Sequence, residues 1–176
     1  ADSHGLHAYG LRTMWPWRDW VLKAFKENMP YDKFVTWQIA GDLIPNKTRE
    51  QDLATAFNRN TPMTAEGGVI DDEWRLHYVF DRTETLSTAF LGLTVACAKC
   101  HDHKFDPISQ RDYYQLASFF NNIKELGMTG DDGDFGPLLP MPSKEKENEI
   151  SQIKTKIDDK EKEINIQKNE LREFYS

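Results

Sequence analysis

The sequence of 176 residues predicts a mainly α-helical protein: an irregular multi-helix domain with long loops, followed by a single C-terminal helix or coiled-coil segment. Apolar residues recur every three or four positions in several separate stretches, which is the period of an amphipathic helix. Segments rich in glycine and proline separate these stretches, and near position 143 the composition changes to mostly charged and amide residues. We therefore expect a helical domain over residues 1–126, a Gly/Pro linker over 127–142 and a charged helix or coiled coil over 143–176.

Three helices are expected in the first third of the chain. Pro16 suits the first turn of the first helix, because a proline lacks the N–H that would have no partner there. The expected buried face of this helix is Trp17, Trp20, Val21, Ala24 and Phe25. A second helix follows and ends at Gly41. The third begins at Thr48, which forms a capping box with Gln51, and continues to about Phe57.

The longest helical pattern runs from Asp71 to Leu93 and leads directly into the only two cysteines of the chain. Beyond the cysteines, Ser109 and Asp112 have the spacing of a helix cap followed by an acid three residues later. The expected buried face of the helix that they begin is Tyr113, Leu116, Ala117, Phe119, Phe120 and Ile123. The cysteine pair is therefore expected between two well-formed helices, which give a binding site rigid support.

The two cysteines belong to the motif Cys97-Ala98-Lys99-Cys100-His101. Two residues between the cysteines and a histidine directly after the second are typical of c-type haem attachment. In that chemistry the two thiols add to the two vinyl groups of the porphyrin, and the imidazole ligates the iron. We predict that haem c is held by Cys97 and Cys100, with His101 as the proximal iron ligand.

Other interpretations of this motif stay open. A zinc or other metal site could use Cys97, Cys100, His101 and His103, although structural zinc sites usually gather ligands from two separated pairs. A redox disulfide is less favoured because no βαβ pattern surrounds the cysteines. If the motif carries no haem, the alternative is a non-redox helical scaffold or binding module, whose Cys/His cluster holds a metal or is structural.

A sixth ligand to the haem iron is also considered. Met63 is the single large apolar residue in the polar, glycine-rich stretch 58–68, and a thioether sulfur is a common ligand on the second side of haem iron. Met63 is therefore the first candidate, ahead of Met128 and His77. An open coordination position or a ligand from a missing segment is the alternative, and a methionine that only fills a surface gap is the ordinary explanation of Met63.

Charge and hydropathy limit the partners. The formal net charge of −7 argues against nucleic acid and anionic membranes as partners. No apolar run approaches the length of a membrane span. Haem is attached to such motifs outside the cytoplasm, so we expect a periplasmic or otherwise exported protein. The chain reads as a fragment with its export signal upstream, and the expected partners are other domains of the same polypeptide and a redox partner protein.

The residues after position 143 carry a short heptad pattern. Its apolar positions are Ile150, Ile153, Ile157, Ile164, Leu171 and Phe174. Lys160 and Gln167 interrupt this seam. We expect one helix that pairs with a partner helix, and a single exposed helix between domains is the alternative.

Several blocks of the sequence together resemble one known family. These blocks are residues 15–21, 41–45, 57–60, 66–68, 81–82 and 92–108, and the last of them, which contains the cysteine motif, is the most specific. Residues 1 to about 125 are similar to the domain of unknown function found in planctomycete-type cytochrome c proteins. The resemblance implies that the chain holds the C-terminal part of that domain.

The resemblance also implies a setting for the motif. Proteins of this kind are large, exported and multi-domain, and they often carry a cytochrome c domain upstream and a further uncharacterised domain downstream. It supports haem attachment through Cys97, Cys100 and His101. It supplies no reaction, so the question of enzymatic activity stays open.

Overall fold

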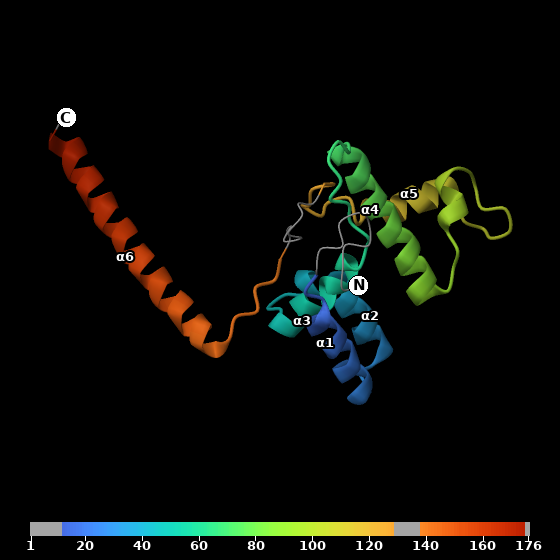
Figure 1. The fold of residues 1–176 in the computed structure, drawn as a ribbon, viewed down its shortest axis with the longest axis horizontal. Helices are drawn as coiled ribbons and strands as arrows, with labels where there is room; N and C mark the ends of the chain where they lie inside the picture. The colour runs from blue at the N-terminus through green and yellow to red at the C-terminus, as the bar shows by residue number, and fades with distance from the viewer. Residues whose placement is uncertain (1–11, 129–137, 175–176) are drawn as a thin grey trace. The chain divides into compact units, whose positions relative to one another are not determined.

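The computed structural model describes residues 12–128 and 138–174. Its longer helices are α1 (Trp15–Lys26), α2 (Tyr31–Ala40), α3 (Arg49–Ala54), α4 (Asp71–Leu86), α5 (Gln110–Ser118) and α6 (Lys144–Phe174) (Figure 1). The only β pairing within the described ranges is an isolated bridge between Thr64 and Met128. The predicted mainly α-helical class is therefore confirmed. The chain divides into two compact units, residues 1–139 and 140–176.

Helices α1, α2 and α3 pack around a cluster of aromatic residues. Trp20 of α1 stacks on Phe34 of α2, with ring centroids 5.7 Å apart and an interplanar angle of 8°. Ala54 of α3 is fully buried against them. Gly41 is required where α2 ends, because a Cβ there would collide with the carbonyl oxygen of Gln51. The capping box of Thr48 and Gln51 is present as predicted, and it starts α3.

Three details of the predicted helices are wrong. The buried stripe of α1 runs through Pro16, Trp20 and Ala24, so Phe25 lies about 100° further around the helix and is 71% exposed. Helix α3 ends at Ala54 and continues as a 3-10 turn over Thr55–Arg59. Phe119 follows the last residue of α5 and is 75% exposed.

Helix α4 is shorter than predicted and ends in an unusual way. It stops at Leu86 and continues as a π-helical turn over Ser87–Leu91, and Gly92 then takes a left-handed conformation with φ 66°. Two buried hydroxyls stand just before this change. Thr83 donates to the carbonyl of Val79 at 2.8 Å, and Ser87 donates to the carbonyl of Thr83 at 2.9 Å. Such bonds compete with the helical ladder, and the left-handed glycine ends it.

A buried polar network holds two loops on α4. The guanidinium of Arg82 pairs in bidentate fashion with the carboxylate of Glu125, and its Nε–H donates to the carbonyl of Asn58 at 2.7 Å. Tyr78 accepts a hydrogen bond from the N–H of Thr64 at 2.9 Å and donates to the carbonyl of Gly127. Loop 60–70 and segment 125–128 are therefore fastened to the same helix.

The second unit contains α6. Every side chain of α6 that the structure describes is exposed. Across the described ranges, no helix combines the length and the apolar character that crossing a bilayer would require.

Candidate functional site

The cysteine motif begins on a short 3-10 turn, Ala96–Lys99, in the long loop between α4 and α5, and Cys100 caps the end of that turn (Figure 1). Cys97 and Cys100 are both exposed free thiols. Ala98, between them, is 0% exposed and packs in a cluster with Val95 and Tyr113. The turn is therefore anchored through Ala98, and it leaves both sulfurs accessible from solvent.

Contacts with α5 fix the position of this turn. The carbonyl oxygen of Lys99 accepts from Gln110 Nε2 and from the hydroxyl of Tyr114, each at 3.1 Å. The Asp102 carboxylate accepts from the backbone N–H of Gln110, the first residue of α5, at 2.8 Å. An N–H in the first turn of a helix has no partner within that helix, so Asp102 supplies one.

The start of α5 is itself well capped. Ser109 and Asp112 form the predicted capping box, and the Ser109 hydroxyl, donating at 2.6 Å, keeps the pKa of the Asp112 carboxyl below its usual value. The loop is thus joined to a helix end that its own sequence stabilises. Sequence reasoning missed Asp102, Gln110 and Tyr114, because their contacts join residues 8 to 15 positions apart and leave no local pattern.

His101 has the arrangement expected of an iron ligand. Its side chain is exposed, and Nδ1 lies 2.8 Å from the backbone carbonyl oxygen of Asp102. With the hydrogen on Nδ1, the ring donates to this carbonyl, and Nε2 keeps a free lone pair. Histidines that bind metals usually donate their other ring N–H to a carbonyl or carboxylate in this way.

His103 is used differently, as part of the loop itself. Its Nδ1 accepts from the backbone N–H of Asp106 at 2.9 Å, and its own backbone N–H donates to the carbonyl of Ile108 at 2.8 Å. These bonds close a compact turn over residues 103–108. The two histidines of the motif loop are therefore distinct in the structure: His101 is accessible, and His103 is structural.

The four residues of the alternative metal site, Cys97, Cys100, His101 and His103, do not form a coordination site. Within residues 12–128 and 138–174, no group of three or more His, Cys, Asp and Glu side chains is arranged to hold a metal ion. One reason is that the Nδ1 atom of His103 is already occupied by its own loop.

The candidates for a sixth iron ligand lie in different environments. Met63 is 2% exposed and belongs to the interior of the first unit. Met128 is exposed, and its backbone N–H donates to the Asp71 carboxylate at 3.0 Å. His77 lies on α4, with its Nε2 3.9 Å from a Glu73 carboxylate oxygen. Among the residues that the structure describes, none of the three bonds to the motif, so the assignment of Met63 stays a prediction.

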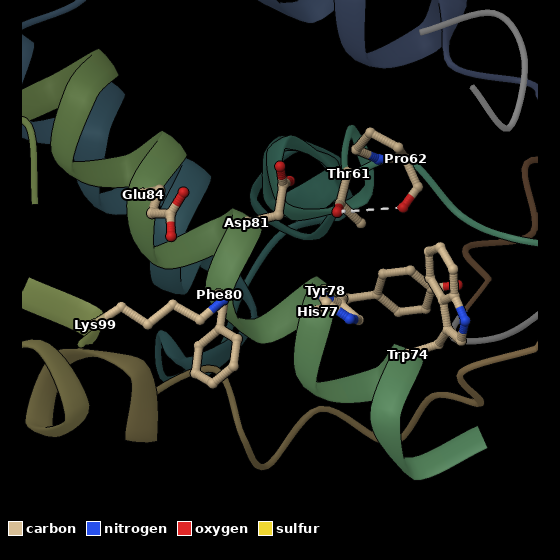
Figure 2. Close-up of a pocket in the computed structure, with 9 residues that line it drawn as sticks. All are labelled: Thr61, Pro62, Trp74, His77, Tyr78, Phe80, Asp81, Glu84 and Lys99. Atoms are coloured by element: carbon tan, nitrogen blue, oxygen red, sulfur yellow. Dashed lines mark hydrogen bonds between the residues drawn. The ribbon is translucent and has the colours of Figure 1, made fainter. Parts of the chain in front are cut away.

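A pocket of about 250 Å³ adjoins the motif loop and was not predicted. Figure 2 shows that α4 supplies most of its wall, with Thr61 and Pro62 opposite and Lys99 of the motif reaching in from the loop. The Nζ atom of Lys99 lies 4.2 Å from the centroid of the Phe80 ring, a cation–π contact. The pocket therefore shares one residue with the motif.

One wall of the pocket is tied to α5. Glu84 accepts a hydrogen bond from the hydroxyl of Tyr113 at 3.0 Å. Burial, together with this bond, raises the pKa of Tyr113. Because Tyr113 also packs on Ala98, a single side chain contacts both the pocket wall and the cysteine turn.

Comparison with known families shows to which family this domain belongs. Residues 1–125 match the family PSCyt2, described as a protein of unknown function (DUF1549). The chain belongs to this family. The PSCyt2 match includes the cysteine turn, the pocket residues and Glu125 of the buried ion pair, and it confirms the resemblance to a domain of unknown function of planctomycete cytochrome c type. Searches of curated proteins and of solved structures found no match to the chain.

Proposed function

We propose that this PSCyt2 domain attaches one c-type haem through Cys97 and Cys100, with His101 as the proximal ligand, and that it acts in electron transfer or a redox reaction. One observation carries the proposal. Two free, exposed thiols lie on a short turn and at its cap, and the residue directly after the second is an accessible histidine whose Nδ1 lies against a carbonyl oxygen. This is the donor set that c-type attachment needs.

The chemistry of attachment fits these side chains. Each thiol S–H adds across one vinyl C=C bond, so that sulfur bonds to one carbon and the hydrogen goes to the other, and no oxidant is consumed. Both thiols must be reduced and accessible for this addition, as Cys97 and Cys100 are. When bound, the haem iron would supply a one-electron Fe(III)/Fe(II) couple.

Exposed apolar side chains on both sides of the motif support the same proposal. Leu91 and Leu93 come just before it, and Phe105, which is 83% exposed, comes just after it. Burial of such side chains against an apolar partner is favourable. They are available to cover the faces or edge of a porphyrin, which is a broad, mostly apolar ring.

The proposal implies a compartment and partners. Attachment of haem to a Cys-x-x-Cys-His motif takes place outside the cytoplasm, so the protein would be periplasmic or otherwise exported. Its electrons would pass to or from a redox partner protein or another domain of the same polypeptide. The exposed position of the motif suits such an exchange, because electron-transfer partners must approach the cofactor closely.

The test is expression of the chain in an exporting host that attaches haem. We expect the intact mass to exceed the sequence mass by one haem, and we expect the Soret absorption to stay with the protein after acid–acetone extraction. The Cys97→Ser/Cys100→Ser variant should lose both signals. If the parent has the bare mass and both thiols alkylate freely, the proposal is wrong and the non-redox scaffold interpretation replaces it.

The two histidines provide a matched pair of variants for the axial ligand. His101→Ala should remove the ligand-bound spectrum of the attached haem. His103→Ala should alter the spectrum only slightly, because that ring bonds within its own loop. Equal loss in both variants would contradict the assignment of His101.

Met63 stays the sequence-based candidate for the second axial position. Methionine ligation to ferric haem gives a weak far-red charge-transfer band, which Met63→Leu should erase while keeping the volume of the buried side chain. Met63 is 2% exposed, so leucine is the conservative replacement at this position. A parent spectrum without the band, or a band that survives the substitution, excludes Met63.

A further inference from the structure

Helix α6 has an apolar stripe that no other described residue of its own unit covers. It is 31 residues long, and its isoleucines at 150, 153, 157 and 164 are all exposed. Most helices in proteins owe their stability to packing of such a stripe rather than to intrinsic propensity. A helix of this length therefore indicates a partner whose surface complements the stripe.

The stripe follows a heptad repeat. Taking Ile150 as position a, the a positions hold Ile150, Ile157, Ile164 and Leu171, and the described d positions hold Ile153, Lys160 and Gln167. β-Branched residues are common at the a positions of parallel two-stranded coiled coils, whose d positions usually hold leucine rather than the isoleucine and polar residues found here.

Charged residues flank this seam in a self-complementary order. In a parallel, in-register pair of helices, each g residue lies near the e residue five positions further along the other helix. The three pairs formed in this way are Glu149 with Lys154, Lys156 with Glu161, and Glu163 with Lys168. All three join opposite charges, and two-fold symmetry makes each of them occur twice.

We propose that α6 forms a parallel, in-register two-stranded coiled coil with α6 of a second copy of this chain. In this register every apolar residue of the seam faces its own copy. The polar residues are confined to two layers, those of Lys160 and Gln167. The Nζ atom of Lys160 already lies 2.6 Å from a carboxylate oxygen of Glu163, so the like charges of the Lys160 layer have local counter-ions.

An antiparallel pair fits less well. The antiparallel register that pairs the most opposite charges also gives attractive contacts, Lys154 with Glu161 and Lys156 with Glu163. However, it places Gln167 opposite Ile150 and Lys160 opposite Ile157. Each polar group would then be buried against an apolar one, which costs more than grouping polar residues with each other.

The test uses the whole chain under reducing conditions, so that Cys97 and Cys100 cannot link two copies. Analytical ultracentrifugation should show a concentration-dependent equilibrium between monomer and dimer. A chain that remains monomeric at roughly 0.1 mM, where micromolar pairing would be saturated, overturns the proposal.

Charge reversals then test the register. Lys156→Glu should weaken the dimer by roughly tenfold, since two attractive pairs become repulsive, and Glu161→Lys should do the same. The double variant should restore the parental affinity, because the parallel pairing only exchanges the two charges. If both single variants weaken the dimer and the double variant does not recover it, the parallel register is wrong.

Lys162→Glu is the matched control. It changes the net charge by the same amount as Lys156→Glu but lies at position f, outside the seam. It should leave the dimer affinity unchanged, and circular dichroism should show the same helix content in all variants. An effect of Lys162→Glu equal to that of Lys156→Glu would overturn the proposed seam. None of these results depends on haem attachment.

Discussion

The middle of α4 and the loop that follows it differ in how they use polar groups. Around Tyr78 and Arg82, the phenol, the guanidinium and the Glu125 carboxylate are paired with one another or with the backbone. In the loop over residues 92–108, the chemically reactive groups are exposed, and the paired ones belong mostly to the backbone. The two regions therefore have different roles. Buried pairs stabilise the fold, and backbone hydrogen bonds orient exposed side chains that can still react.

The largest effect is expected where a buried charge loses its partner. Glu125→Gln leaves the guanidinium of Arg82 in the core without a countercharge, and we expect a loss of about 3 kcal/mol in the free energy of unfolding. Urea denaturation of the unloaded chain measures it. The matched control is Glu50→Gln, which breaks the exposed ion pair with Lys23 and should change the midpoint far less. Equal losses would remove the distinction between the buried network and the surface.

A smaller loss is expected from the buried phenol. Tyr78→Phe leaves the N–H of Thr64 and the carbonyl of Gly127 without their partner, which should cost about 2 kcal/mol. Tyr114→Phe removes one hydrogen bond of a partly exposed residue in α5 and should cost less than about 1 kcal/mol. Chemical denaturation compares the two, and a greater loss from Tyr114→Phe would reverse our ranking of the two regions.

Alkaline pH should sharpen the comparison further. Burial and the bond to Glu84 raise the pKa of Tyr113 above its ordinary value of 10.0. A raised folded-state pKa means that this contribution to stability is complete below about pH 10 and is lost as the pH rises further. The denaturation midpoint of the parent should therefore fall above about pH 10, and Tyr113→Phe should flatten that fall. A parallel decline in both proteins would contradict the role of Tyr113.

The smallest effect on stability is expected where the chemistry lies. Replacing Cys97 and Cys100 by serine should change the free energy of unfolding of the unloaded chain by less than about 0.5 kcal/mol, because both thiols are exposed. Ala98→Leu, between them, should cost several times more, since that side chain is fully buried. Denaturation of the reduced proteins tests this order, and a large loss from the serine variant would give the cysteines a structural role.

Local signals predicted much of the fold. The capping boxes at Thr48 and Ser109 were readable because the cap and its partner are three residues apart. The end of α4 was misplaced because the left-handed conformation of Gly92 and the hydroxyl bonds of Thr83 and Ser87 are choices that an apolar repeat does not reveal. Phe25 was misassigned for a similar reason. It follows the buried Ala24, and a three-to-four-residue apolar repeat does not distinguish such a neighbouring position from a buried one.

In the candidate site, too, contiguous features were predictable from the sequence and long-range contacts were not. The motif itself is contiguous, so its residues were identified from spacing alone. The contacts that orient it were not, because Asp102 reaches Gln110 and Lys99 reaches Tyr114 only after the chain has turned. The pocket beside it was missed for the same reason, since residues 61–62, α4 and Lys99 meet only in the folded domain.

The buried alanine of the cysteine turn has a consequence for protein engineering. The two spacer positions of the motif are not equivalent: position 98 admits only a very small side chain, whereas the longer Lys99 side chain lies over Phe80 at the pocket. The turn also takes its orientation from Gln110 and Tyr114. A transplant of the five-residue motif alone into another scaffold would lose that orientation. The smallest segment suitable for transplantation is residues 95–114, and the recipient scaffold must offer a surface against which Tyr113 can pack.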